Sequence, residues 1–342
     1  MKPNILLIYT GGTIGMVTNP ATGALKPFNF TQIMNEVPEL NRLGVNLEII
    51  TFDPVIDSSD MNPEIWCRLA NLIAENYEKY DGFVILHGTD TMSYTASALS
   101  FMLQNLSKPV ILTGSQLPIG LIRTDGKENL ITAIEIASAR DEKGAVVPEV
   151  AIYFETKLYR GNRTTKHNAE HFNAFSSDNY PVLAHAGIHI HYFRENILYE
   201  KPGKFQVNTK MDNNVMILKI FPGIKPEIIR QTTQIPELRG IVLETFGSGN
   251  APTTPEFISA IKELCKRNVI VLNVSQCRAG SVNMKSYETG IALLEAGVVS
   301  GHDITTEAAI TKLMFLLGNY NDIDEIKFQI KKSISGEINP IE

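Results

Sequence analysis

Cysteine is scarce in this sequence. The 342 residues contain three, Cys67, Cys265 and Cys277. An odd number of cysteines excludes a dense disulfide framework, and their spacing matches no cysteine-based zinc motif. Free thiols of this kind persist in a reducing compartment, so a cytoplasmic location is expected.

Long apolar runs and an excess of positive charge are also missing. No apolar stretch approaches the roughly 20 residues that cross a bilayer. The apolar run near the N-terminus is short and ends in glycines, which does not fit a signal peptide. Lysine and arginine total 31 against 37 aspartates and glutamates, a formal net charge of −6. We therefore expect neither a membrane nor a nucleic acid as a partner.

Motifs for cofactors and metals are absent as well. There is no GxxxxGK[ST] loop, and GSGNAP at 247–252 is too short and misplaced for a dinucleotide fingerprint. His185, His189 and His191 cluster in a segment that alternates like one strand, but no carboxylate or cysteine joins them in a ligand pattern. We expect no cofactor and no metal.

What the sequence does contain is an alternation of strands and helices. Short apolar runs predict strands over 4–9, 46–52, 82–87, 109–113 and 149–154. The clearest helix starts at Asn62, followed by Pro63 at the first helical position and Glu64 in the first turn. A second helix is expected to begin after Thr91 and to end near Leu106. This alternation predicts an α/β fold with a mostly parallel sheet flanked by helices.

The length of the chain favours two domains over one core. We expect a larger N-terminal α/β domain over 1–190 and an interdomain connection over 191–213, where the sequence becomes polar and uneven. Apolar runs and helical patterns then resume, which predicts a smaller C-terminal α/β domain over 214–342.

Two glycine–threonine turns directly follow predicted strands. The first strand runs into YTGGTIG, which contains Thr13, and the third runs into HGTDT, which contains Thr89 and Asp90. Glycines permit a sharp turn and let backbone N–H groups approach a ligand closely. Ligands of open α/β sheets bind beyond the carboxyl ends of the strands. The two turns therefore predict one shared site built from threonines.

Other strand ends add hydroxyls and an acid to this site. Asp57, Ser58 and Ser59 follow the second strand, and Ser115 follows the fourth. Hydroxyls suit the carboxylate of a small zwitterion, and an acid suits its ammonium group. A threonine hydroxyl is a weak nucleophile unless a base takes its proton. Lys166 is available as that base, because a buried lysine can lose its charge.

These segments resemble the bacterial L-asparaginase family, and its cytoplasmic type I branch in particular. The resemblance rests on IYTGGTIGM, HGTDTM, IDSSDM and GNRTTK. It extends over nearly the whole chain through TGSQLP, RTDGKEN, GSGNAP and QCRAGSVNM. It implies an asparaginase that hydrolyses L-asparagine to L-aspartate and ammonia through a threonine nucleophile and a β-aspartyl ester, without metal or cofactor.

Carried over by position, the resemblance gives each candidate residue a role. Thr13 is the nucleophile, and Thr89, Asp90 and Lys166 form a second cluster in which a neutral lysine accepts a proton through Thr89. Asp90 also binds the α-ammonium group, and backbone N–H groups near Thr89 stabilise the oxyanion. The other substrate-binding positions are Asp57, Ser58, Ser59 and Ser115. The resemblance further implies a homodimer or a homotetramer.

Two departures from the family pattern bear on function. Family members carry a tyrosine in the loop after the first turn, and VTNPATGALKPFNF has none. The proton route at Thr13 must therefore differ, or another residue must supply it. Some type I relatives bind asparagine at an allosteric site, whose pattern Thr165 and Cys277 match, but Glu244 stands at the position of the family's arginine. We therefore expect cooperativity to be reduced or absent.

Alternatives stay open at the levels of function and of single residues. A dual glutaminase–asparaginase is one, because a pocket discriminates a methylene by only about 1–3 kcal/mol. A non-catalytic amino-acid sensor on the same fold is another, although two threonines and a lysine exceed what binding needs. Asp125 fits a helix N-cap better than a functional acid, and we favour a structural role in which Arg123 and Asp125 organise the loop near the site or a subunit contact. His87 fits a core or hydrogen-bonding role better than that of a general base.

Overall fold

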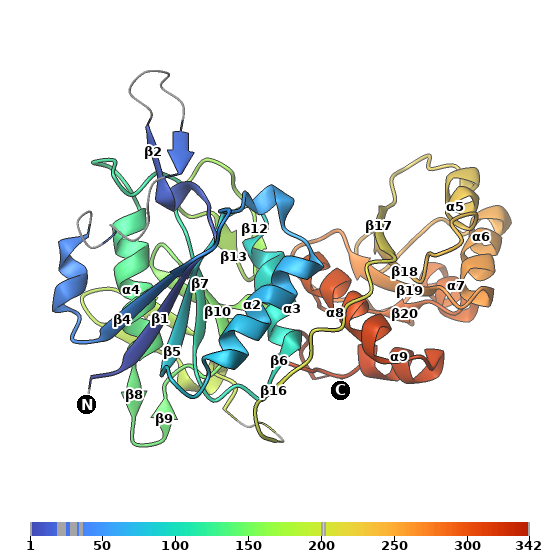
Figure 1. Ribbon diagram of the computed structural model, residues 1–342. Helices are drawn as coiled ribbons and strands as arrows, with labels where there is room; N and C mark the ends of the chain where they lie inside the picture. Colours follow the sequence, from blue (N-terminus) through green and yellow to red (C-terminus); the bar gives the residue numbers. More distant parts are fainter. Residues whose placement is uncertain are drawn as a thin grey trace. The chain divides into compact units, whose positions relative to one another are not determined.

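The computed structural model describes residues 2–18, 25–27, 33, 37–199, 201 and 203–340. The chain forms two compact units, Met1–Thr209 and Lys210–Glu342 (Figure 1). Most of the loop VTNPATGALKPFNF, in which no tyrosine occurs, lies outside the described residues, namely 19–24 and 28–30. No helix in the described ranges is long and apolar enough to cross a membrane.

The first unit is built on an eight-stranded sheet in which five neighbouring strands are parallel and three are antiparallel additions. In spatial order the strands are β15 (Ile190–Tyr192), β14 (Ala184–Ala186), β11 (Lys157–Arg160), β10 (Val150–Phe154), β7 (Val110–Thr113), β5 (Gly82–Leu86), β1 (Asn4–Tyr9) and β4 (Asn46–Thr51). The predicted α/β class with a mostly parallel sheet is confirmed.

Burial explains why the central strands read as continuous apolar runs. Every residue of β5, β7 and β10 is buried, because helices cover both faces of the sheet. The edge strand β4 instead alternates between more and less exposed positions. The core of the unit packs around residues of β1, β5 and β10.

Helices lie on both faces of this sheet. Figure 1 shows α2 (Pro63–Glu75) and α3 (Met92–Met102) on one side and α4 (Gly126–Ser138) on the other. The predicted start of α2 is confirmed: Asn62 Oδ1 accepts a hydrogen bond from Ile65 N at 3.1 Å. The predicted end of α3 near Leu106 is wrong, because Leu103 and Gln104 leave the helix as β6 and pair with β16 (Gln206–Val207).

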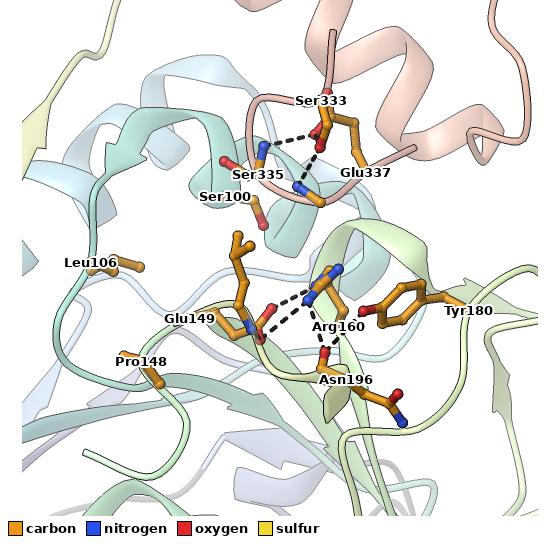
Figure 2. A network of polar contacts seen from close by, with 12 residues as sticks. Ser100, Leu106, Pro148, Glu149, Arg160, Tyr180, Asn196, Ser333, Ser335 and Glu337 are labelled. Carbon is orange, nitrogen blue, oxygen red and sulfur yellow. Dashed lines mark hydrogen bonds and ion pairs between the residues drawn. The ribbon is translucent and has the colours of Figure 1, made fainter. Parts of the chain in front are cut away.

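The antiparallel side of the sheet contains a buried ion pair. Arg160 Nε donates to Glu149 Oε2 at 2.7 Å, and both side chains are at most 6% exposed. Arg160 and Tyr180 also donate to the carbonyl of Asn196 (Figure 2). The segment with His185, His189 and His191, which was expected to alternate like a strand, forms the β14–β15 hairpin. His185 and His191 therefore lie opposite each other on two neighbouring strands.

Short two-stranded ribbons complete the first unit. They are β2 (Met16–Thr18) with β3 (Leu25–Pro27), β8 (Arg140–Asp141) with β9 (Gly144–Ala145), and β12 (Thr165–Lys166) with β13 (Phe175–Ser176). The segment 191–213 therefore includes part of β15 and all of β16, which pair within this unit.

The second unit is a smaller α/β layer. Its four parallel strands follow chain order: β17 (Val215–Lys219), β18 (Gly240–Thr245), β19 (Ile270–Ser275) and β20 (Val299–Ser300). Its helices are α5 (Pro226–Thr232), α6 (Pro255–Lys266), α7 (Glu288–Ala296), α8 (Thr306–Asn319) and α9 (Ile323–Ile330). The parallel strands between helices agree with the predicted α/β pattern of this half.

Candidate active site

The turns that follow β1 and β5 are in direct contact. Gly12 has a φ of +90°, and a Cβ atom at this position would lie 2.6 Å from both Cα and N of Gly88. Only glycine permits this combination of a positive φ and backbone-to-backbone approach. The contact brings the two predicted threonine motifs together, with Thr13 and Thr89 each one residue further along the chain.

The turns after β4 and β7 close around the same point. A Cβ on Gly88 would lie 2.4 Å from Ser58 Oγ, and one on Gly114 would lie 2.3 Å from the His87 carbonyl oxygen. Thr91 Oγ1 donates to the carbonyl of Ser58 at 2.6 Å, which connects the turn after β5 to the turn after β4. Four strand ends therefore converge on the His87–Gly88 backbone, as the strand-end pattern predicted.

Lys166 reaches this edge from a separate hairpin. It lies on β12 and donates from Nζ to Thr89 Oγ1 at 2.7 Å and to Asp90 Oδ1 at 2.6 Å. The Lys166 side chain is 15% exposed, whereas that of Asp90 is 69% exposed. The lysine is therefore held inside the site, and the carboxylate of Asp90 keeps most of its surface for another partner.

Thr13 begins the 3-10 turn Thr13–Gly15 and is half-buried. Its hydroxyl makes no hydrogen bond to any residue in the described part of the chain. The turn itself is anchored, because Ile14 O accepts from Ile119 N at 3.2 Å. The hydroxyl can thus approach a ligand without first giving up a partner among the described residues.

The three predicted residues after β4 differ in their freedom to bind. Asp57 Oδ1 accepts from Ser59 N at 2.9 Å and from Ser59 Oγ at 2.8 Å. These hydrogen bonds lower the pKa of Asp57 below its ordinary value. Ser58 is buried beside Gly88, and its hydroxyl donates to no described residue. Within the described part of the chain, Ser58 is therefore the serine whose hydroxyl is available to donate, while Ser59 first has to turn from Asp57.

The loop after β7 is held by Asp125. Its carboxylate accepts from the backbone N–H groups of Gln116 and Leu117, at 2.9 and 3.1 Å. Asp125 occupies the N-cap position of α4, but its side chain makes no cap bond. The expected structural role in the loop is therefore correct, and the possible capping bond is not formed. The carboxylate therefore accepts from the two backbone N–H groups of the loop instead of from the first turn of α4.

Ser115 and Gln116 occupy different parts of this loop. Ser115 is buried, and its hydroxyl donates to the carbonyl of Leu117 at 2.5 Å. Gln116 instead reaches Thr89, whose hydroxyl donates to Gln116 Oε1 at 3.3 Å. Its place beside Ser115 in the fourth turn was the signal that could have added Gln116 to the predicted set.

His87 is fully buried beneath the turn. Its Nδ1 lies 2.6 Å from the Gly88 carbonyl, and its Nε2 lies 2.8 Å from Thr95 Oγ1. A carbonyl can only accept, so Nδ1 carries the proton and Nε2 accepts from Thr95. Burial lowers the pKa of His87 to about 4. The hydrogen-bonding role that the sequence indicated fits this neutral ring.

The residues of the predicted allosteric pattern are divided between the two units. Thr165 belongs to β12 of the first unit, and Cys277 is an exposed residue of the second. Glu244, on β18, accepts from Thr306 Oγ1 at 2.6 Å. Among the described residues, no three histidine, cysteine or acidic side chains are grouped so that they could hold a metal.

Two family models match the chain in succession. The model "Asparaginase, N-terminal" matches residues 4–198, and the model "Glutaminase/Asparaginase C-terminal domain" matches residues 214–329. Together they cover most of both units.

Individual relatives agree with these matches. L-asparaginase 1 of Escherichia coli K12 is 41% identical over 345 residues, which cover 99% of each protein. The crystal structure of L-asparaginase I from Vibrio cholerae matches with a TM-score of 0.90 at 43% identity, over 99% of this chain and 100% of the other. The thermostable L-asparaginase from Thermococcus kodakarensis matches with a TM-score of 0.87 at 34% identity, over 99% and 100%. The chain belongs to the asparaginase family.

Proposed function

We propose that this protein is an L-asparagine amidohydrolase, which converts L-asparagine to L-aspartate and ammonia. The observation that carries the proposal is the contact of Lys166 with Thr89 and Asp90, on a turn packed against the turn of Thr13. A family relationship alone does not supply a base beside a hydroxyl. Here the base, the hydroxyl and an exposed carboxylate meet at one strand edge.

The substrate is held at its two charged groups. The largely exposed carboxylate of Asp90 binds the α-ammonium group. The free hydroxyl of Ser58 donates to the α-carboxylate, and Ser59 and Asp57 complete this side of the pocket. Ser115 lines the part of the pocket that receives the side-chain amide, and its hydroxyl stabilises the loop there by donating to Leu117. These contacts place the side-chain amide between Thr13 and Thr89.

Hydrolysis proceeds in two steps through a covalent intermediate. Thr13 Oγ1 attacks the amide carbon, its proton passes to the leaving nitrogen, and the C–N bond breaks to release ammonia and leave a β-aspartyl ester on Thr13. Water then adds to the ester carbon, and the Thr13 oxygen leaves with a proton as L-aspartate forms. The backbone N–H of Thr89 makes no hydrogen bond to a described residue, so it is available to stabilise the oxyanion in both steps.

Several further properties belong to the same proposal. The reaction uses protein side chains alone, without metal or cofactor. The active form is a homodimer or a homotetramer in the cytoplasm. The catalytic threonines belong to the first unit, Met1–Thr209, which also contains most of the segment 191–213 that the sequence predicted as a connection. Thr165 and Cys277 match the family's allosteric pattern, but Glu244 stands at the sequence position of that pattern's arginine, so a hyperbolic dependence of rate on L-asparagine is expected.

Ammonia release from L-asparagine tests the proposal. Thr13→Ala removes the nucleophile and should lower kcat at least about a thousandfold. Thr89→Val removes the hydroxyl between substrate and Lys166 and should lower it at least about a hundredfold. Thr233→Val, which alters a buried threonine of the second unit, is the matched control and should keep the parent activity.

The same assay separates the proposal from its alternatives. Equal kcat/KM values for L-asparagine and L-glutamine would contradict the asparagine preference and favour a dual enzyme. Binding of L-asparagine without any ammonia, by a folded parent protein, would refute the enzyme and favour a sensor.

A further inference from the structure

Gln116 bridges two parts of the candidate site. Its Oε1 accepts from Thr89 Oγ1 at 3.3 Å, and its Nε2 donates to the carbonyl of His171 at 3.1 Å. His171 lies between β12 and β13, in the hairpin that carries Lys166. One side chain therefore connects the turn of Thr89 to the hairpin of Lys166.

The partners of this amide determine its orientation. A backbone carbonyl only accepts hydrogen bonds, so the NH₂ group of Gln116 faces His171 and its oxygen faces Thr89. The main chain of Gln116 is fixed as well, since its N–H donates to the carboxylate of Asp125. The amide cannot turn over without losing its bond to His171.

The hydroxyl of Thr89 has one proton and two polar neighbours, Lys166 and Gln116. Lys166 Nζ is the donor in its bond with Thr89 and also donates to Asp90. The Thr89 proton therefore points to Gln116, and an oxygen lone pair points to Lys166. For Lys166 to act as a base, it must first release a proton, and the hydroxyl must then turn its hydrogen from Gln116 to Lys166.

We propose that Gln116 is a positioning residue for the hydrolysis. It holds Thr89 Oγ1 within hydrogen-bond distance of Lys166. Its Oε1 accepts the hydrogen bond from the Thr89 hydroxyl until Lys166 is neutral. In the transfer itself the proton moves from Thr89 Oγ1 to Lys166 Nζ, and the hydrogen bond to Gln116 Oε1 is lost. This assignment rests on the proposed function and adds a residue to its proton route.

The substitution Gln116→Glu is the sharpest test, because it keeps an acceptor beside Thr89 and adds a negative charge one hydroxyl away from Lys166. The charge favours the ammonium form of Lys166. The acidic limb of the kcat–pH profile should therefore move to higher pH by about one to two units. Ionisable groups on the elements next to Lys166 are unchanged in this variant: Asp90, Asp125, His167, Glu170, His171 and Asp178.

Gln116→Leu tests the tether without a charge. Leucine fills a similar volume but neither accepts from Thr89 nor donates to His171. We expect kcat to fall about tenfold while KM stays within about twofold, since no substrate-binding group is removed. Gln206→Glu is the matched control for charge, because Gln206 is exposed on β16 and pairs with β6 beyond the far end of α3. It should retain the parent profile.

The outcomes separate this inference from the function beneath it. An active parent with an unshifted profile for Gln116→Glu would overturn the inference and leave the hydrolase intact. A kcat of Gln116→Leu equal to that of the parent would likewise overturn the inference and leave the hydrolase intact. A folded parent that releases no ammonia would overturn the proposed function and the inference with it.

Discussion

The protonation and direction of single hydrogen bonds organise the candidate site. His87 is the clearest example, because each partner in its chain has a fixed role. Trp66 Nε1 can only donate, and it donates to Thr95 Oγ1 at 3.0 Å. Thr95 then donates to His87, and His87 donates to the Gly88 carbonyl. This series of hydrogen bonds holds the His87–Gly88 backbone, on which four turns converge.

Acid should therefore destabilise the fold through His87. Its pKa is about 4 in the folded protein and near 6.5 when unfolded. The unfolded state binds more protons in between, so the stability is complete above pH 6.5 and is lost as the pH falls toward 4. This group alone should lower the free energy of unfolding by about 2–3 kcal/mol from pH 7 to pH 4.5.

Urea unfolding at the two pH values measures this contribution. His87→Gln should show a pH dependence weaker by about the same 2–3 kcal/mol, because glutamine does not titrate. An identical pH dependence in parent and variant would refute the assigned neutral ring.

At the scale of elements, helix starts were predictable only where the cap is local. Asn62 caps α2 through its side chain, and Thr305 caps α8 in the same way. Asp125 stands at the corresponding position of α4, yet its carboxylate binds the loop at Gln116 and Leu117. Aspartate suits an N-cap, but here its carboxylate binds the backbone of a loop that lies close to it only in the folded chain.

Substitution by serine distinguishes these two uses. Serine is as good an N-cap as asparagine, so Asn62→Ser should change the free energy of unfolding by less than about 0.5 kcal/mol. Asp125→Ser leaves two partly buried N–H groups without their acceptor and should cost about 1–3 kcal/mol. Denaturant unfolding of both variants is the measurement, and a neutral Asp125→Ser would show that the loop does not depend on the carboxylate.

At the scale of the whole molecule, each unit has its own hydrophobic core and its own buried ion pair. In the second unit, Lys312 Nζ lies 2.6 Å from Glu337 Oε1, and both side chains are 0% exposed. Glu337 also accepts from the backbone of Ile334 and Ser335 (Figure 2). Burial lowers the pKa of Lys312, and the attraction of Glu337 opposes this shift.

Removal of the lysine should weaken the second unit strongly. Lys312→Met leaves the carboxylate of Glu337 buried without a cation, which costs about 3–5 kcal/mol. Hydrogen exchange of α8 measures the loss. Lys79→Met breaks the exposed pair with Glu48, 61% and 54% exposed, and should destabilise the protein far less, because water solvates both charges with or without the pair. Equal effects of the two substitutions would contradict this difference.

Much of the fold and part of the site followed from local patterns. The parallel strands read as apolar runs because helices bury both faces, and the start of α2 is written in consecutive residues. Strand-end turns with Thr13, Ser58 and Thr89 could be placed at one edge by the rule for open sheets. The end of α3 could not, because β16, with which Leu103 and Gln104 pair, is about a hundred residues away in the chain.

The sequence by itself determined the α/β class, the family and the threonine turns, since these depend on short-range periodicity and on motifs of adjacent residues. Tertiary structure alone decided how those groups meet. Lys166 touches Thr89 across 77 residues, Gln116 points at Thr89, and Asp125 binds a loop rather than a helix end. Such contacts depend on competition among distant partners for a few donors and acceptors, and only the folded chain resolves that competition.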